Sequence, residues 1–186
     1  MQIRKRCLTA AAAVLILFLA AAISFLTYIS PPKDKVDCFD YPPEFFCTGA
    51  GARIDCQRDR KCAAYAAAYL LRCFGEDADG GSLFPELKRP LGFVSANSIA
   101  DVLAQHGYPA KACRGSIDAL KQRLAEGSPI IVFIRIPGDT HYAVAVGYDE
   151  RHLYLADSLA ENANASDARY NHVLTTEAFE ALWNTG

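Results

Sequence analysis

A chain of 186 residues has room for one domain of ordinary size together with accessory segments. Its 52% hydrophobic and 22% charged residues are typical of a globular protein and exclude a disordered chain. The formal net charge of −2 favours no particular partner, and because no Lys/Arg-rich run occurs beyond Arg4–Arg6 we expect no nucleic acid to bind.

The N-terminal segment predicts a membrane-spanning helix. Three basic residues in "MQIRKRC" precede an uninterrupted apolar run of 22 residues, from Leu8 to Ile29. As a helix this run is about 33 Å long, which is enough to cross the hydrocarbon core of a bilayer. The basic flank indicates that the chain after Pro31 lies outside the cytoplasm. A cleaved signal peptide is the alternative, although its apolar run is usually only about 7–15 residues long.

Four segments follow from this pattern. We expect a basic cytoplasmic segment over 1–7, a single-pass cell-membrane anchor over 8–29, an extracytoplasmic arm over 30–55 and a compact domain over 56–186. The arm holds four prolines and two glycines in no steady period, which predicts an irregular conformation.

Three helices are predicted in the first part of the domain. The stretch "CAAYAAAYLLRCFG" (62–75) has strong helix formers and is apolar on all sides, so we expect a buried, central helix that stops at Gly75. Residues 95–107 and 116–127 each begin with a serine at the N-cap position and end with a glycine.

Strands dominate the second part. We expect strands over 129–136, 141–148 and 153–158, a short strand around 170–174 and a final helix over 175–183. Helices followed by an antiparallel sheet predict an α+β fold.

A thiol at a helix start is the first candidate for chemistry. Unpaired backbone N–H groups and the helix dipole stabilise an anion there, so the thiolate of Cys62 is favoured, as a nucleophile requires. Gln57 precedes it by five residues. Its amide, together with the backbone N–H of Cys62, could hold the oxyanion of a tetrahedral intermediate.

The run "HYAVAVGYDERHLYLADS" (141–158) supplies the other candidates. His141 opens a strand and could act as base and then acid, and Asp157 could orient its imidazole. Both side chains share a sheet face only if the hairpin pairs residues whose numbers add to an even value, such as 143 with 157. That register needs an odd-numbered loop or a β-bulge.

The stretches "QRDRKCAAYAAAYLLRCFG", "IDALKQRLAEGSPIIVFIRI", "HYAVAVGYDERHLYLADS" and "TEAFEALW" resemble, in this order, the bacterial C39-like peptidases of the papain-like superfamily. The resemblance implies a helical lobe with a buried central helix packed against an antiparallel sheet. It also implies Gln57 as oxyanion-hole donor, Cys62 as nucleophile, His141 as base and Asp157 as orienter, without a cofactor.

Two features depart from the family pattern. The family usually has glycine directly after the cysteine, whereas this chain has Ala63-Ala64-Tyr65, and Tyr65 could narrow the cleft. The leader-processing members act on the cytoplasmic side of a transporter, so a double-glycine leader is a poor candidate for the substrate of an outward-facing domain.

The exported cysteines predict disulfides, because these are the default in an oxidising compartment. Cys62 and Cys73 lie about 16 Å apart along one helix and cannot pair. With Cys62 as nucleophile, we expect a Cys38–Cys47 bridge and a second bridge between two of Cys56, Cys73 and Cys113. The chain has no C-x-x-C pair and its four histidines are scattered, so no metal is expected.

These observations predict a membrane-anchored extracytoplasmic cysteine peptidase that hydrolyses a peptide or amide bond of a peptide or protein substrate through an acyl-enzyme on Cys62. Two alternatives stay open. An NlpC/P60-type peptidoglycan hydrolase also places a cysteine before a histidine, but Ala63 and Asp157 fit its pattern less well. A non-catalytic module could bind peptides or a partner on the same fold.

Overall fold

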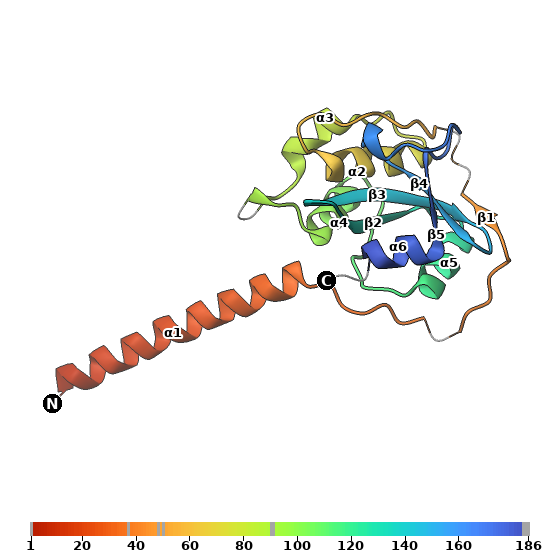
Figure 1. Ribbon diagram of the computed structural model, residues 1–186. Coiled ribbons are helices and arrows are strands. Elements are labelled where there is room, and N and C mark those ends of the chain that lie inside the picture. The colour runs from red at the N-terminus through yellow and green to blue at the C-terminus, as the bar shows by residue number, and fades with distance from the viewer. Residues whose placement is uncertain (1, 37, 48, 50, 90–91, 184–186) are drawn as a thin grey trace.

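The structure is a computed structural model, and it describes residues 2–36, 38–47, 49, 51–89 and 92–183. It combines helices with an antiparallel sheet, as the α+β prediction requires (Figure 1). The elements are α1 Gln2–Ile29, β1 Phe45–Phe46, α2 Cys62–Cys73, α3 Gly80–Leu83, the 3-10 helix η1 Phe84–Glu86, α4 Ala96–Gln105, α5 Ile117–Ala125, β2 Ile130–Ile136, β3 Asp139–Tyr148, β4 His152–Ala156, the 3-10 helix η3 Ala160–Asn162, β5 His172–Thr175 and α6 Thr176–Trp183.

Helix α1 projects away from the rest of the molecule (Figure 1). Its stretch Ala12–Ile29 has a mean hydropathy of 2.5 and none of it is buried, so this helix is long and apolar enough to cross a membrane. A signal sequence near the N-terminus has the same properties. The last turn of α1 meets α4, where the Tyr28 hydroxyl donates to Asp101 at 3.2 Å and Asn97 donates to the Tyr28 carbonyl.

The sheet has five antiparallel strands in the order β1-β3-β4-β5, and β2 pairs with β3 as well. Side chains of β3 alternate between its two faces. Tyr142 and Val144 pack in a cluster with α2 and α4, while Ala143 and Ala145 pack in a cluster with α5 and α6. Because both faces are covered, β3 is apolar from Tyr142 to Tyr148 instead of alternating with polar residues.

Helix α2 is the buried central helix that its composition predicts. Ala64, Ala67 and Ala68 are 0% exposed, and their small side chains let the helix pack closely on β3. The helix ends at Cys73, and Gly75 follows with a φ of 94°, a left-handed conformation that glycine adopts without strain. The predicted serine N-caps of α4 and α5 are also present, since Ser95 and Ser116 accept hydrogen bonds from the backbones of Ser98 and Ala119.

Part of the N-terminal arm joins the sheet. The two residues of β1 pair with Gly147 and Tyr148 of β3. A Cβ at position 147 would lie 2.4 Å from the Phe46 ring, so only glycine permits this close approach. The short elements β1, α3, η1 and η3 were not predicted, because runs of two to four residues carry no periodic pattern.

The disulfide prediction is wrong. Cys38, Cys47, Cys56, Cys62, Cys73 and Cys113 are all free thiols in the part of the chain that the structure describes. Cys47 lies in the α5/α6 core, where its Sγ donates to the Leu124 carbonyl at 3.7 Å, whereas Cys38 is exposed on the arm. Burial raises the pKa of the Cys47 thiol to about 12, so this residue packs as a small apolar side chain.

Candidate active site

His141 and Asp157 are in direct contact. His141 Nε2 lies 2.6 Å from Asp157 Oδ1, and the two residues are 1% and 0% exposed. A contact this short between a ring nitrogen and a carboxylate is a strong, charge-assisted hydrogen bond. The hairpin thus brings together two of the predicted site residues.

A β-bulge produces the required register. Next to the turn, Tyr148 pairs with Leu153, and this odd-numbered register would place His141 and Asp157 on opposite faces. The ladder shifts between Ala145 and Gly147, after which Val144 pairs with Ala156 in an even-numbered register. The extra residue, Val146, therefore turns the end of β3 so that His141 faces Asp157.

The carboxylate of Asp157 accepts further hydrogen bonds. The backbone N–H of Leu159 lies 2.9 Å from Oδ1, while Asn162 Nδ2 and His172 Nδ1 lie 2.9 Å and 3.0 Å from Oδ2. Burial acts to raise the pKa of Asp157, but the hydrogen bonds from His141 and His172 outweigh it and hold the pKa well below its ordinary value. Asp157 is thus a buried anion.

His141 is correspondingly stabilised as a cation. Burial acts to lower its pKa, but the hydrogen bond to Asp157, assisted by the side chain of Cys62, outweighs burial and raises the pKa to about 9. Because Asp157 engages Nε2, Nδ1 is the ring nitrogen that remains for the Cys62 thiol. The imidazole therefore carries its proton through the neutral pH range.

Cys62 is the first residue of α2 and is half-buried. Lys61 at the N-cap makes no side-chain capping bond. No capping side chain therefore competes with an anion for the positive end of the helix dipole. The two residues before Lys61, Asp59 and Arg60, both have a φ of 56°, which is unusual for residues other than glycine. Such backbone strain is concentrated at functional sites.

An ion pair connects the loop before α2 to the start of β3. Arg60 Nη2 donates to Asp139 Oδ2, and these residues precede Cys62 and His141 by two positions each. This ion pair joins the segment before Cys62 to the segment before His141. The proximity of the two segments is consistent with the contribution of Cys62 to the raised pKa of His141.

Gln57 is tied to the residue after Asp157. Its backbone N–H donates to the Ser158 carbonyl at 2.8 Å, and its Oε1 accepts from the Ser158 hydroxyl at 2.9 Å. This contact uses the carbonyl oxygen of the side-chain amide, whose NH₂ group can only donate hydrogen bonds.

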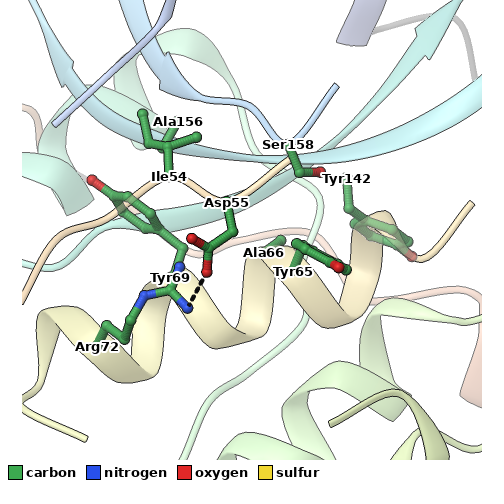
Figure 2. A pocket seen from close by; sticks show the side chains of 9 residues that line it. All are labelled: Ile54, Asp55, Tyr65, Ala66, Tyr69, Arg72, Tyr142, Ala156 and Ser158. Atoms are coloured by element: carbon green, nitrogen blue, oxygen red, sulfur yellow. Dashed lines mark ion pairs between the residues drawn. The ribbon is translucent and has the colours of Figure 1, made fainter. Parts of the chain in front are cut away.

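A small cavity lies between α2 and the segment that carries Ile54 and Asp55 (Figure 2). Its volume of about 10 Å³ has room for a single water molecule. Asp55, Tyr65 and Arg72 line it, and Arg72 Nη1 lies 3.2 Å from Asp55 Oδ2. Tyr65 also packs against Gly80, where a Cβ would come within 2.6 Å of its ring.

Several residues around Asp157 escaped the sequence reasoning. His172 and Asn162 bind its carboxylate, and Asn171 binds its backbone. Neither "YNH" nor "ENAN" is a recognised motif, and the short strand HVLT does not show from its pattern which residue faces the core. Among the described residues, no group of three or more His, Cys, Asp or Glu side chains could hold a metal ion.

The Peptidase_C39 like family model matches residues 51–185, which is most of the chain. The chain belongs to this family. No curated protein matches closely enough to count as a relative of this C39-like chain. The predicted family is thus confirmed over nearly the whole region that carried the resemblance.

Solved structures resemble this C39-like fold at low sequence identity. A protein from Bacillus anthracis described as a C39-like peptidase has a TM-score of 0.57 and 18% identity, over 74% of this chain and 91% of that one. The peptidase domain of Streptococcus ComA, a bi-functional ABC transporter involved in a quorum-sensing pathway, has a TM-score of 0.59 and 18% identity, over 72% and 93%. These similarities concern the fold alone.

Proposed function

We propose that this C39-like protein is a cysteine peptidase whose domain is held outside the cell membrane by α1. The observation that carries the proposal is the buried His141–Asp157 pair, in which Nε2 and Oδ1 are 2.6 Å apart and Cys62 also contributes to the raised pKa of the imidazole. A helix-end thiol beside a protonated imidazole is what a thiolate–imidazolium pair requires. The family match favours this function over the NlpC/P60 alternative.

In the proposed reaction, the Cys62 thiolate attacks the carbonyl carbon of a peptide or amide bond. Gln57 Nε2 and the backbone N–H of Cys62 stabilise the resulting oxyanion. His141 gives its Nδ1 proton to the leaving amine as the C–N bond breaks, which leaves an acyl-enzyme. The neutral imidazole then takes a proton from water, and the hydroxide releases the acid and restores the Cys62 thiolate.

The remaining groups prepare this reaction. Asp157 holds the imidazole in the orientation that presents Nδ1 to the thiol, and its negative charge compensates the imidazolium. The proposal includes a papain-like layout, in which the helix that carries the thiol packs against the sheet that carries the base. It also divides the exported part of the chain into an arm over 30–55 and a peptidase domain over 56–186. Tyr65 packs against α3, and this is consistent with a site that tolerates the Ala63-Ala64-Tyr65 departure.

Alkylation of the full chain in detergent micelles tests the function. We expect iodoacetamide to modify Cys62 rapidly well below about pH 8, where ordinary thiols react slowly, with peptide-resolved mass spectrometry as the readout. Cys56, an exposed thiol six residues earlier, is the internal control and should react slowly at the same pH.

The variant His141→Ala should abolish the rapid reaction of Cys62 and leave Cys56 unchanged. A Cys62 that reacts no faster than Cys56 in the unaltered protein would refute the thiolate–imidazolium pair and favour the non-catalytic binding module. Cleavage of a fluorogenic peptide library, lost in Cys62→Ala, would then define the bond and the sequence preference.

A further inference from the structure

Asp157 lies just beyond the end of β4, where ladder pairing stops. The side chain of Asn171 replaces the missing ladder. Its Oδ1 accepts from the Asp157 backbone N–H at 2.8 Å, and its Nδ2 donates to the Asp157 carbonyl at 2.9 Å. The residue before β5 therefore holds the main chain of Asp157 in place.

The next residue, His172, contacts the side chain of Asp157. It pairs with Leu155 in the β4–β5 ladder, so its side chain shares a face with Leu155 and, two residues further on, with Asp157. His172 is 7% exposed, and its Nδ1 lies 3.0 Å from Asp157 Oδ2. Nδ1 must be the donor in this contact, because an ionised carboxylate only accepts.

The carboxylate is saturated by these contacts. Oδ1 accepts from His141 and from the Leu159 backbone, and Oδ2 accepts from His172 and Asn162. A carboxylate offers about four lone-pair sites, so all of them are occupied. Rotation of the group about its Cβ–Cγ bond would break several charge-assisted hydrogen bonds at once.

We propose that His172 is a positioning residue, which acts through Asp157 to keep the His141 imidazole directed at Cys62. The proposal rests on the function proposed above and extends it, because it assigns a buried histidine that takes no part in the chemistry itself. In this arrangement two histidines share one carboxylate, one on each oxygen. His141 transfers protons with Asp157 as its partner, and His172 fixes the plane of the Asp157 carboxylate.

The charged neighbours of the pair are few among the described residues. His141 faces Asp157 and Cys62, and its charge also reaches Asp139 at the start of β3. Asp157 faces His141 from β3 and His172 from β5. Among the described residues, these contacts connect position 172 to Cys62 through Asp157 and His141, which makes the pH profile of Cys62 the appropriate readout.

Two variants of the full chain in detergent micelles separate the hydrogen bond from the bulk of the ring. His172→Phe keeps a ring and removes the donor, while His172→Asn keeps an N–H near the position of Nδ1. The rate of Cys62 alkylation by iodoacetamide is measured across a pH series. We expect His172→Phe to slow the reaction below neutral pH by about tenfold, the effect of losing one hydrogen bond to a charged group, and His172→Asn to restore most of it.

His152→Phe is the matched control. His152 is a half-exposed histidine on β4, and its Nδ1 contacts Asp149 at 3.2 Å instead of Asp157. We expect its alkylation profile to equal that of the unaltered protein. If His172→Phe fails to fold by near-UV circular dichroism, His172→Val, with a strand-forming side chain, carries the same test.

The outcomes distinguish the two proposals. An unaltered protein with fast, His141-dependent alkylation and a folded His172→Phe or His172→Val with the same profile would overturn the role of His172 alone. A folded His172→Asn no faster than His172→Phe would overturn the hydrogen-bond explanation. Slow alkylation of Cys62 in the unaltered protein would overturn both proposals, because there would be no activated pair for His172 to position.

Discussion

At the scale of single residues, the charge of Asp157 controls the proton on His141. We predict that Asp157→Asn lowers the pKa of His141 from about 9 towards its ordinary value of 6.5, because the amide keeps the shape of the carboxylate but not its charge. The alkaline limb of peptidase activity should move to lower pH, and the rate at neutral pH should fall at least about tenfold. A pH–rate profile measures both effects.

Asp139→Asn is the control for this prediction. Asp139 is a partly exposed carboxylate two residues before His141, and it pairs with Arg60 instead of contacting the imidazole. Its loss should move the alkaline limb much less than the loss of Asp157 does. Equal shifts in the two variants would mean that general charge near β3, and not the buried hydrogen bond, sets the pKa of His141.

The same residues determine how stability depends on pH. The folded-state pKa of His141 lies above 6.5, so its protonated form contributes stability that is fully present below about pH 6.5 and is lost as the pH rises through about 9. The pKa of Asp157 lies below its ordinary value of 3.8, so its contribution is present above about pH 4 and is lost at lower pH.

At the scale of elements, Arg72 of α2 binds Arg53 and Asp55, which lie in the segment that leads to Gln57. The guanidinium is 4% exposed, donates to the Arg53 and Ala78 carbonyls, and pairs with Asp55 at 3.2 Å (Figure 2). We predict that Arg72→Met lowers the free energy of unfolding by about 2–3 kcal/mol, because it leaves buried acceptors without a donor. Urea denaturation measures this change.

The same variant should reduce peptidase activity more than stability alone explains, since a loosened segment misplaces the Gln57 amide. Lys88→Met is the comparison, because Lys88 forms an exposed pair with Asp101 at 2.8 Å and surface pairs contribute little. A urea midpoint for Arg72→Met as high as that for Lys88→Met would contradict the role given to Arg72.

At the scale of the whole molecule, the location of the domain depends on the fate of α1. We predict that the full chain stays in the membrane pellet after alkaline carbonate extraction, because none of the apolar stretch Ala12–Ile29 is buried. Added protease should degrade the domain in intact cells. A soluble product that begins near Pro31 would show instead that α1 is a cleaved signal sequence.

The helices and most strands follow from local pattern. The serine caps before α4 and α5, the glycine after α2 and the apolar run of β3 each act within a few residues of the element that they define. The sequence therefore predicts these elements to within a few residues. The chemistry of Cys62 and His141 could also be suspected, because a thiol at a helix start and a histidine near the start of a strand are visible in the chain.

Whether Asp157 meets His141 was decided by the tertiary structure. The bulge at Val146 selects the register in which Asp157 faces His141, and apolar alternation leaves both registers open. The hydrogen bonds that Asn171 and His172 make to Asp157 depend on where β5 pairs with β4, and the sequence pattern does not specify this pairing. The free cysteines show the same limit, since disulfide geometry depends on where two distant segments lie. Local propensity acts over a few bonds, whereas register, burial and hydrogen-bond partners arise only when remote segments pack together.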